Sequence, residues 1–232
     1  MRQLETVQKS RRTFLKRTCI ATAAVAGVGA FWAAKSESRT ARLLRQILAD
    51  NQRKILPAPV APNPASWSDN NITICWLGHA TTLINFYGVH ILTDPTLGHR
   101  IGLALGVGTA GPKRYIAPAL RFEELPPIDV LLLSHAHMDH MDVATLSRIA
   151  PKTFTVTAKT TSDVLSGTGL KQITELPWRG KTTFHSAKGD LEIEAFEVKS
   201  GATAGRAASR AATTATCCGA KGRRFCLAAI PR

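Results

Sequence analysis

The sequence predicts an α/β fold, and two stretches of the chain carry that prediction. Residues 129–133 read Asp-Val-Leu-Leu-Leu, an apolar run with the length of a buried strand, and a polar loop then leads into a helical pattern at residues 142–149. Residues 72–93 are rich in β-branched and aromatic side chains and contain a Tyr87-Gly88 turn, which is typical of antiparallel strands. Strands and helices in this order are expected to form one α/β domain.

The other elements follow from local patterns along the chain. Apolar residues recur at helical spacing among basic ones in residues 39–54, so an amphipathic helix is expected there, packed on the domain or lying on a membrane surface. Prolines at positions 57, 59, 62 and 64 then exclude helix and central strand. A Gly-rich loop at residues 97–121 is expected to cover the functional site. Strands are expected at residues 72–77, 81–86, 89–93, 129–133, 153–158, 172–176, 182–186 and 191–198, and a second short helix at 161–165.

The N-terminus has the pattern of an export signal. Residues 10–16 read Ser-Arg-Arg-Thr-Phe-Leu-Lys, which is a twin-arginine motif, and a mildly apolar, Ala/Gly-rich stretch follows at residues 18–34. This pattern predicts export by the twin-arginine route to the periplasm, with residues 1–34 either cleaved or kept as an inner-membrane anchor. Membrane association through the N-terminus is therefore expected.

The net charge of +14 is carried by the two ends of the chain. Residues 1–54 hold 12 basic and 3 acidic side chains, and residues 200–232 hold 6 basic and none that is acidic. Residues 55–199 are left with 12 basic and 13 acidic side chains, which is close to neutral. A nucleic-acid partner is therefore not expected, because such a partner needs a basic surface on the domain itself. The expected partner is a small-molecule or lipid substrate, and the oligomeric state stays open.

Three histidines and a carboxylate gather directly after the apolar run at residues 129–133. Residues 135–140 read His-Ala-His-Met-Asp-His, and imidazole nitrogen and carboxylate oxygen are the donors that Zn²⁺ or Fe²⁺ accept. His135 and His137 are two residues apart and can face one metal. Asp139 and His140 come from the next turn of chain and can face a second metal. The sequence therefore predicts a metal centre at the carboxyl end of this strand.

These motifs resemble those of the metallo-β-lactamase superfamily, in the branch of N-acyl-phosphatidylethanolamine phospholipase D-like and lactonase-like proteins. The similar segments are Trp-Leu-Gly-His-Ala-Thr at 76–81, Leu-Thr-Asp-Pro at 92–95 and the histidine motif. The resemblance implies an αββα sandwich and a hydrolase with two Zn²⁺, with Fe or Mn as alternatives. Phosphodiester cleavage of an N-acyl phospholipid is the reaction that it favours. Lactone or ester hydrolysis is the alternative.

The resemblance also implies roles for individual residues. Asp139 and His140 are expected to serve in catalysis as well as in metal binding. His79 borders the site in this family and is a candidate for contacting substrate or water, although a structural role is equally open. Asp94 is expected to orient the histidine loop by a hydrogen bond rather than to bind metal. His90, His99 and His185 lie in no motif and are expected to have no function in the site.

The character of the sequence changes after Lys199. Ala, Thr, Gly, Arg and Cys predominate in residues 200–232, and a third histidine and a bridging aspartate that the resemblance implies are missing. Codon choices for residues 210–232 in a shifted frame can spell two strands ending in Gly-Gly-Asp, so we expect a frameshift and a truncated, incomplete sandwich. On that interpretation the chain as given is an inactive metal-binding fragment. The expected segments are a signal or anchor (1–34), a basic helix and Pro-rich linker (35–70), a partial metallo-β-lactamase-like domain (71–199) and a disordered, out-of-frame tail (200–232).

Overall fold

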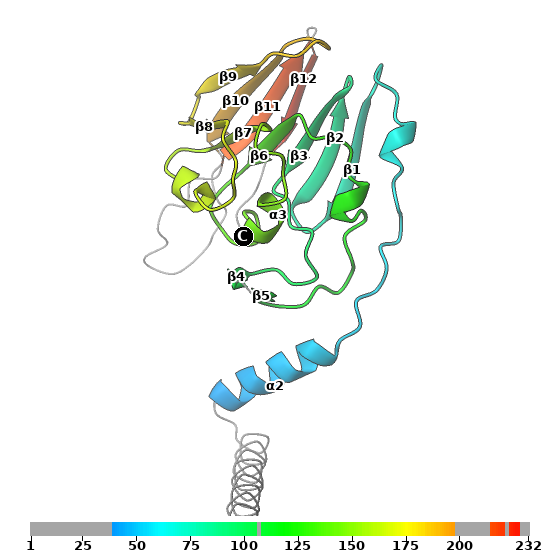
Figure 1. Cartoon of the computed structure of the whole chain (residues 1–232), viewed down its shortest axis with the longest axis vertical. Coiled ribbons are helices and arrows are strands. Elements are labelled where there is room, and N and C mark those ends of the chain that lie inside the picture. The colour runs from blue at the N-terminus through cyan, green and yellow to red at the C-terminus, as the bar shows by residue number, and fades with distance from the viewer. Residues whose placement is uncertain (1–38, 106–107, 198–213, 221–222, 228–232) are drawn as a thin grey trace, which may run out of the picture. The chain divides into compact units, whose positions relative to one another are not determined.

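The structure is a computed structural model that describes residues 39–105, 108–197, 214–220 and 223–227 (Figure 1). The chain divides into two units, Met1–Arg53 and Lys54–Arg232. Within the first unit, α2 (Arg39–Gln52) confirms the helix expected from the apolar spacing. The export motif and the apolar stretch at residues 18–34 lie outside the described residues. Among the helices of the described part, none is long and apolar enough to span a bilayer.

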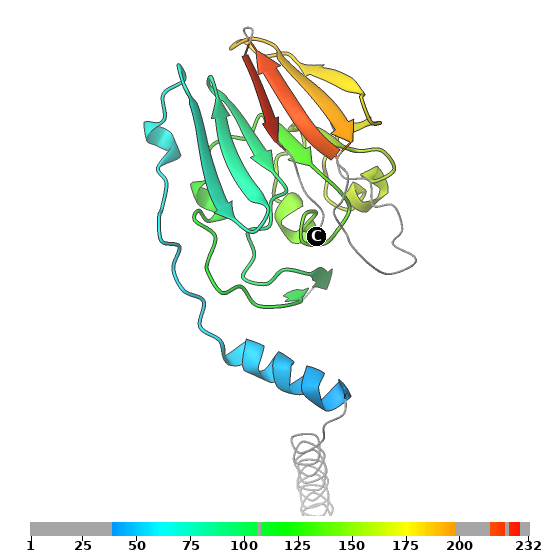
Figure 2. The ribbon, with the colours of Figure 1, turned by 180° about the vertical axis from the view of Figure 1, so that it is seen from behind.

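A six-stranded mixed sheet forms the centre of the second unit (Figure 2). Its strand order is β1-β2-β3-β6-β7-β8; β1 to β3 are antiparallel, and β3, β6, β7 and β8 are parallel. All six strands were expected from the sequence. They are β1 (Ile72–Gly78), β2 (Thr81–Phe86), β3 (Val89–Thr93), β6 (Val130–Leu133), β7 (Phe154–Ala158) and β8 (Ile173–Leu176).

A second, antiparallel sheet has the order β12-β11-β10-β9. The expected hairpin is confirmed by β9 (Lys181–Phe184) and β10 (Leu191–Glu197), which pair Leu191 with Phe184. The expectation of a disordered tail needs correction for residues 214–220 and 223–227, because β11 (Thr214–Ala220) pairs with β10 and β12 (Arg223–Leu227) pairs with β11. The other residues of this tail lie outside the described part of the chain. Alternating apolar sequence is weak in this segment, but the open edge of β10 provides backbone groups with which a further strand can pair.

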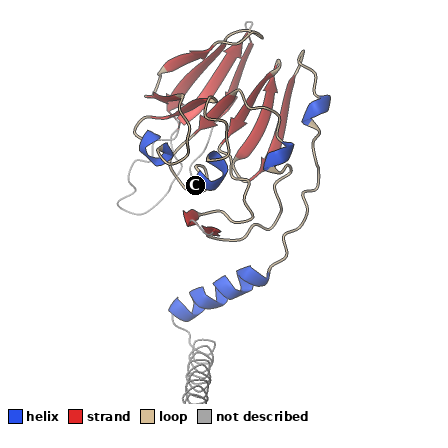
Figure 3. Ribbon diagram, in the orientation of Figure 1, coloured by secondary structure: helices blue, strands red, loops and turns tan. Residues whose placement is uncertain are grey.

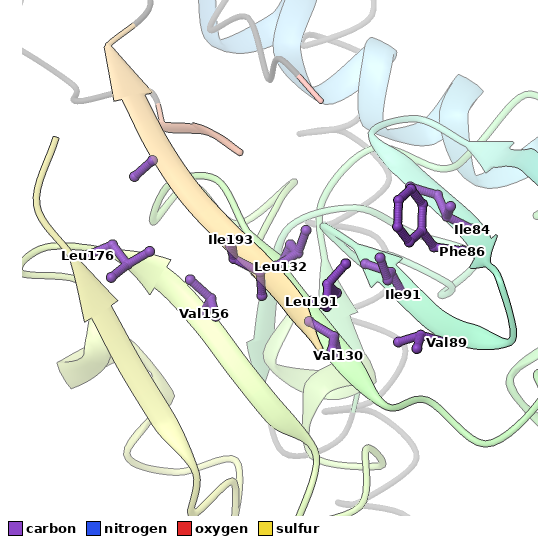
Figure 4. Close-up of a cluster of buried hydrophobic side chains, with 11 residues drawn as sticks. Ile84, Phe86, Val89, Ile91, Val130, Leu132, Val156, Leu176, Leu191 and Ile193 are labelled. Atoms are coloured by element: carbon purple, nitrogen blue, oxygen red, sulfur yellow. The ribbon is translucent and has the colours of Figure 1, made fainter. Parts of the chain in front are cut away.

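The two sheets pack face to face around an apolar core. Val130 and Leu132 of β6 point toward the second sheet, where they meet Leu191 and Ile193 of β10 (Figure 4). The side chains of Leu131 and Leu133 point to the opposite face of the larger sheet, where they pack with Leu146 of the helical turn at residues 143–146. Because both faces of β6 are covered, an uninterrupted apolar run is what this strand requires. The two sheets thus form a sandwich, and the short helical turns at residues 122–124, 143–146 and 162–165 contribute Phe122, Leu146 and Leu165 to the cluster on the outer face of the larger sheet (Figure 3).

Several short elements differ from their expected form. The helix expected at residues 142–149 is the single turn α3 (Val143–Leu146), and the one expected at 161–165 is the 3₁₀ turn η3 (Ser162–Leu165). The Gly-rich loop contains a small hairpin of β4 (Leu103–Leu105) and β5 (Gly108–Ala110) that the sequence did not indicate. Two more 3₁₀ turns, η1 (Pro64–Ser66) and η2 (Phe122–Glu124), complete the described elements. The prolines at 57–64 were expected to exclude helix, and η1 corrects this, because proline is tolerated in the first turn of a helix.

The carboxylate of Glu175 in β8 is expected to make the stability of the fold depend on pH. Its carboxylate accepts hydrogen bonds from the backbone N–H groups of Thr160, Thr161 and Ser162, at 3.1, 3.0 and 2.8 Å. Hydrogen bonds from Ser162 and the neighbouring amides lower the pKa of Glu175 to about 2. The carboxylate therefore stabilises the fold above its ordinary pKa of 4.5, and this contribution is lost as the pH falls toward 2.

We expect Glu175→Gln to lower the free energy of unfolding by about 1–2 kcal/mol at pH 7, because an amide accepts these bonds less strongly than a carboxylate. The deficit should shrink as the pH approaches 2, where the wild-type side chain is itself protonated. Urea denaturation at pH 7 and at pH 3 measures both values. The control is Glu192→Gln, on the exposed Lys181 ion pair, which should change stability by less than about 0.5 kcal/mol. An equal loss for Glu175→Gln across this pH range would contradict the assignment.

Candidate metal centre

The predicted site residues meet at one edge of the larger sheet. β1, β3 and β6 run in the same direction, because β2 is antiparallel to both β1 and β3, and β3 is parallel to β6. Their carboxyl ends therefore lie at a common edge. His79 follows β1, Asp94 follows β3 and the histidine loop follows β6. This topology explains how residues up to 60 positions apart in the chain come into contact.

Asp94 is the buried anchor of the histidine loop. Its Oδ1 accepts the backbone N–H of Ser134 at 2.8 Å, and its Oδ2 lies 2.6 Å from Ser134 Oγ and 2.7 Å from His140 Nδ1. Asp94 has a φ of 38°, and His79 a φ of 55°, in a region that non-glycine residues rarely adopt. Asp94 therefore contacts the histidine loop through hydrogen bonds to Ser134 and His140.

His135 and His137 form the first donor pair. His135 Nε2 lies 2.9 Å from His137 Nδ1, while His135 Nδ1 lies 3.0 Å from Ser134 Oγ. Because Ser134 Oγ can donate its proton to the Asp94 carboxylate, its oxygen can accept from His135 Nδ1, which leaves the Nε2 lone pair facing His137. Burial, reinforced by His140, lowers the pKa of His135 to about 4. The imidazole is therefore neutral at pH 7, as a metal ligand must be.

Asp139 and His140 form the second donor group, and the structure adds His79 to it. His79 Nε2 lies 3.1 Å from Asp139 Oδ2, and His140 Nε2 lies 3.8 Å from the same oxygen. One ligand atom from each of these three residues lies within 4.8 Å of the other two, which is close enough to hold one metal ion. His140 keeps Nε2 available for this purpose because its Nδ1 bonds to Asp94.

The ionisation states within this group follow from its contacts. Burial opposes the charge on Asp139, but the hydrogen bond from His79 and the proximity of His140 together lower the pKa of this carboxyl. Burial also opposes protonation of His140, but the hydrogen bond and charge of Asp94 outweigh it and raise the pKa. Asp139 is therefore ionised at neutral pH and can serve as an anionic ligand.

Two contributing residues were missed by the sequence analysis. Ser134 links Asp94 to His135, and Trp76 Nε1 donates a 2.7 Å hydrogen bond to the backbone carbonyl of His79. The signal for Ser134 was available, since a hydroxyl directly before a ligand histidine can bond its ring. His90 and His185, which were expected to have no function in the site, lie outside the donor groups and contact the Pro127 carbonyl and Asp190.

A pocket of about 1200 Å³ opens beside the donor groups. His79, His137 and Asp139 lie in its wall, and most of the remaining lining is apolar. The Gly-rich loop supplies much of that lining, as its position before the histidine motif had suggested. The apolar side chains at this surface include Trp76, Ile101, Tyr115, Ile116 and Met138.

Comparison with known proteins identifies the domain. Residues 90–228 match the family described as Beta-lactamase superfamily domain. The chain is 40% identical over 82 residues to N-acyl-phosphatidylethanolamine-hydrolyzing phospholipase D 1 of Caenorhabditis elegans, covering 35% of this chain and 22% of that protein. It is 30% identical over 105 residues to the mitochondrial N-acyl-phosphatidylethanolamine-hydrolyzing phospholipase D of Saccharomyces cerevisiae, covering 44% of this chain and again 22% of the relative.

Solved structures share the fold at low sequence identity. The crystal structure of a possible metal-dependent hydrolase from Veillonella parvula has a TM-score of 0.50 at 15% identity, and the match covers 68% of this chain and 61% of that one. The chain thus spans less than a quarter of the two phospholipases that it matches, and somewhat under two thirds of this structural neighbour.

Proposed function

Because this chain belongs to the metallo-β-lactamase superfamily, we propose that its histidine loop forms a metal-dependent hydrolytic centre that cleaves the phosphodiester of an N-acyl phospholipid. The observation that carries the proposal is the meeting of two donor groups at one sheet edge. One is His135 with His137, and the other is His79 with Asp139 and His140. Asp94 fixes their mutual orientation.

The donor chemistry fits zinc. Imidazole nitrogens with one ionised carboxylate are typical zinc ligands. His135 and His137 would hold one ion, and Asp139 and His140, with His79 beside them, would hold another. When bound, zinc supplies a water of near-neutral pKa and polarises the oxygen of the group under attack. Iron and manganese accept similar donors, so the metal content of the purified protein distinguishes the three.

The residues of the chain supply orientation and proton handling. Asp94 and Ser134 hold His140 and His135 with one ring nitrogen bonded and the other directed into the site. Asp139 is ionised and part of its side chain reaches the pocket, where its carboxylate can accept a proton from a reacting water. His79 holds Asp139 Oδ2 in place.

The pocket supports a substrate with an apolar portion. Its lining is mainly apolar, and fatty acyl chains gain free energy when they leave water for such a surface. Both named phospholipases among the relatives act on N-acyl-phosphatidylethanolamine, which carries such chains. A neutral lactone or ester is the alternative substrate and serves as the comparison in the test.

We further propose that residues 200–232 are translated out of frame, so that the intact protein has a third histidine and a bridging aspartate that this chain lacks. The absence of acidic residues there and the Gly-Gly-Asp ending recovered in a shifted frame support this proposal. Nucleotide sequencing from the codon for Glu197 to beyond that for Arg232 tests it. A one-base change that restores His after Lys199 is the expected result, and a genuine frame without such an alternative would refute it.

Hydrolysis is tested with the protein from the restored frame beside the 232-residue chain. N-palmitoyl phosphatidylethanolamine, a medium-chain lactone and p-nitrophenyl butyrate are the substrates, before and after chelation and re-addition of Zn²⁺. We expect the restored protein to release phosphatidic acid in a metal-dependent reaction, and the 232-residue chain to show little turnover. Preference for the lactone or ester would replace the proposed substrate, and no metal-dependent turnover of any of them would overturn the hydrolytic function.

A further inference from the structure

A buried cation lies in the wall of the pocket outside the donor groups. Arg114 is 7% exposed, its Nε donates to the Gly98 carbonyl at 2.8 Å, and its Nη2 donates to the Thr96 carbonyl. No carboxylate of the described residues is within ion-pair distance. The charge of Asp142 raises the pKa of Arg114, against the effect of burial, which lowers it. The oxygens of Asp142 accept hydrogen bonds from Thr145 Oγ1 and the Ala144 backbone N–H, and none from Arg114. Among the described residues, Arg114 is thus a buried cation that no carboxylate contacts directly.

One nitrogen of this guanidinium is left without a partner. Among the described residues nothing accepts a hydrogen bond from Nη1. Nη1 lies beside Gly78, since a Cβ placed on that glycine would be 3.4 Å away from it. Gly78 precedes His79, and Arg114, Gly78 and His79 all line the pocket. An unpaired N–H on a buried cation is costly, so such a group indicates that something else accepts its hydrogen bonds.

We propose that Arg114 recognises the phosphate of the substrate, and that the apolar part of the same molecule lies against Trp76, Ile101 and Ile116. A guanidinium is the side chain best suited to phosphate, because it stays charged and donates in a fixed planar geometry. The carbonyls of Thr96 and Gly98 hold the guanidinium, and the lack of a side chain at Gly78 leaves Nη1 uncovered on that side. This inference rests on the proposed function and names the residue that would select a phosphodiester over a neutral ester.

The test measures binding by calorimetry, in phosphate-free buffer, with the full chain treated with EDTA and again with Zn²⁺. The probes are hexyl phosphate, inorganic phosphate and hexanol. Hexyl phosphate should bind most tightly, since it offers both the anion and the apolar chain. Arg114→Gln should weaken hexyl phosphate roughly 10- to 100-fold and leave hexanol unchanged, because one charge-assisted contact is lost. Arg114→Lys should retain part of the affinity.

Arg121→Gln is the matched control, since that arginine is exposed and paired with Glu124. It should bind all three probes as the wild type does. The proposal would be overturned if Arg114→Gln bound hexyl phosphate with the affinity of the wild type. It would also be overturned if a folded Arg114→Lys lost affinity for hexyl phosphate and for hexanol by the same factor. Inorganic phosphate binding as tightly as hexyl phosphate would overturn the part that concerns the apolar chain. Failure of hydrolysis with these binding differences intact would count against the proposed function alone.

Discussion

Replacing His135 and His137 together by Asn is expected to lower the affinity for Zn²⁺ by more than about 100-fold, beyond the 10–100-fold typical of lost outer contacts. Both side chains contribute to one donor pair with 2.9 Å between their nitrogens. Since burial lowers the pKa of His135 to about 4, this imidazole is already neutral at pH 7 and can bind metal without first losing a proton. Competition with a chromophoric chelator measures the affinity directly.

The matched control for this pair is the double substitution of His90 and His185 by Asn. Both are imidazoles outside the donor groups, in contact with the Pro127 carbonyl and Asp190. The control should bind Zn²⁺ with the affinity of the wild type. If the His135/His137 variant did so too, the first metal position would have to be abandoned.

Asp94→Asn is expected to lower Zn²⁺ affinity about 10–100-fold and the free energy of unfolding by about 2–4 kcal/mol. The carboxylate accepts from Ser134 N, Ser134 Oγ and His140 Nδ1, whereas an amide presents one oxygen and an N–H₂ group that opposes one of these donors. The buried site leaves the mismatched groups without water. His140 would then lose the bond that keeps its Nε2 directed into the site.

Asp129→Asn serves as the control, because Asp129 also accepts a backbone N–H, that of His90, next to the opposite end of β6. It should cost some stability and leave metal affinity unchanged. Chemical denaturation and chelator competition on the same samples separate the two effects. A loss of stability in Asp94→Asn with unaltered metal affinity would show that Asp94 supports only the fold.

The sequence by itself predicted the strands of the larger sheet and the loop that carries the candidate metal ligands. The apolar run before His135 has the length and composition of a buried strand, and the six strands of the larger sheet were recognised from patterns that depend on neighbouring residues alone. The positions of His135, His137, Asp139 and His140 within six residues likewise placed these donors on one short loop, because they are neighbours in the chain. Asp94 was named because it ends its strand within the Leu-Thr-Asp-Pro segment of the family resemblance, and the structure shows its carboxylate 2.7 Å from His140 Nδ1.

Only the tertiary structure decided what surrounds that loop. The partnership of His79 with Asp139 depends on β1 and β6 ending at the same sheet edge, which is set by the pairing order of four strands and not by local spacing. The burial of Arg114 likewise arises from the folding back of the Gly-rich loop onto Thr96 and Gly98. The strands at 214–220 and 223–227 pair with β10 and with each other, although their own apolar alternation is weak. Contacts of this kind join residues distant in the chain, so no local pattern contains them.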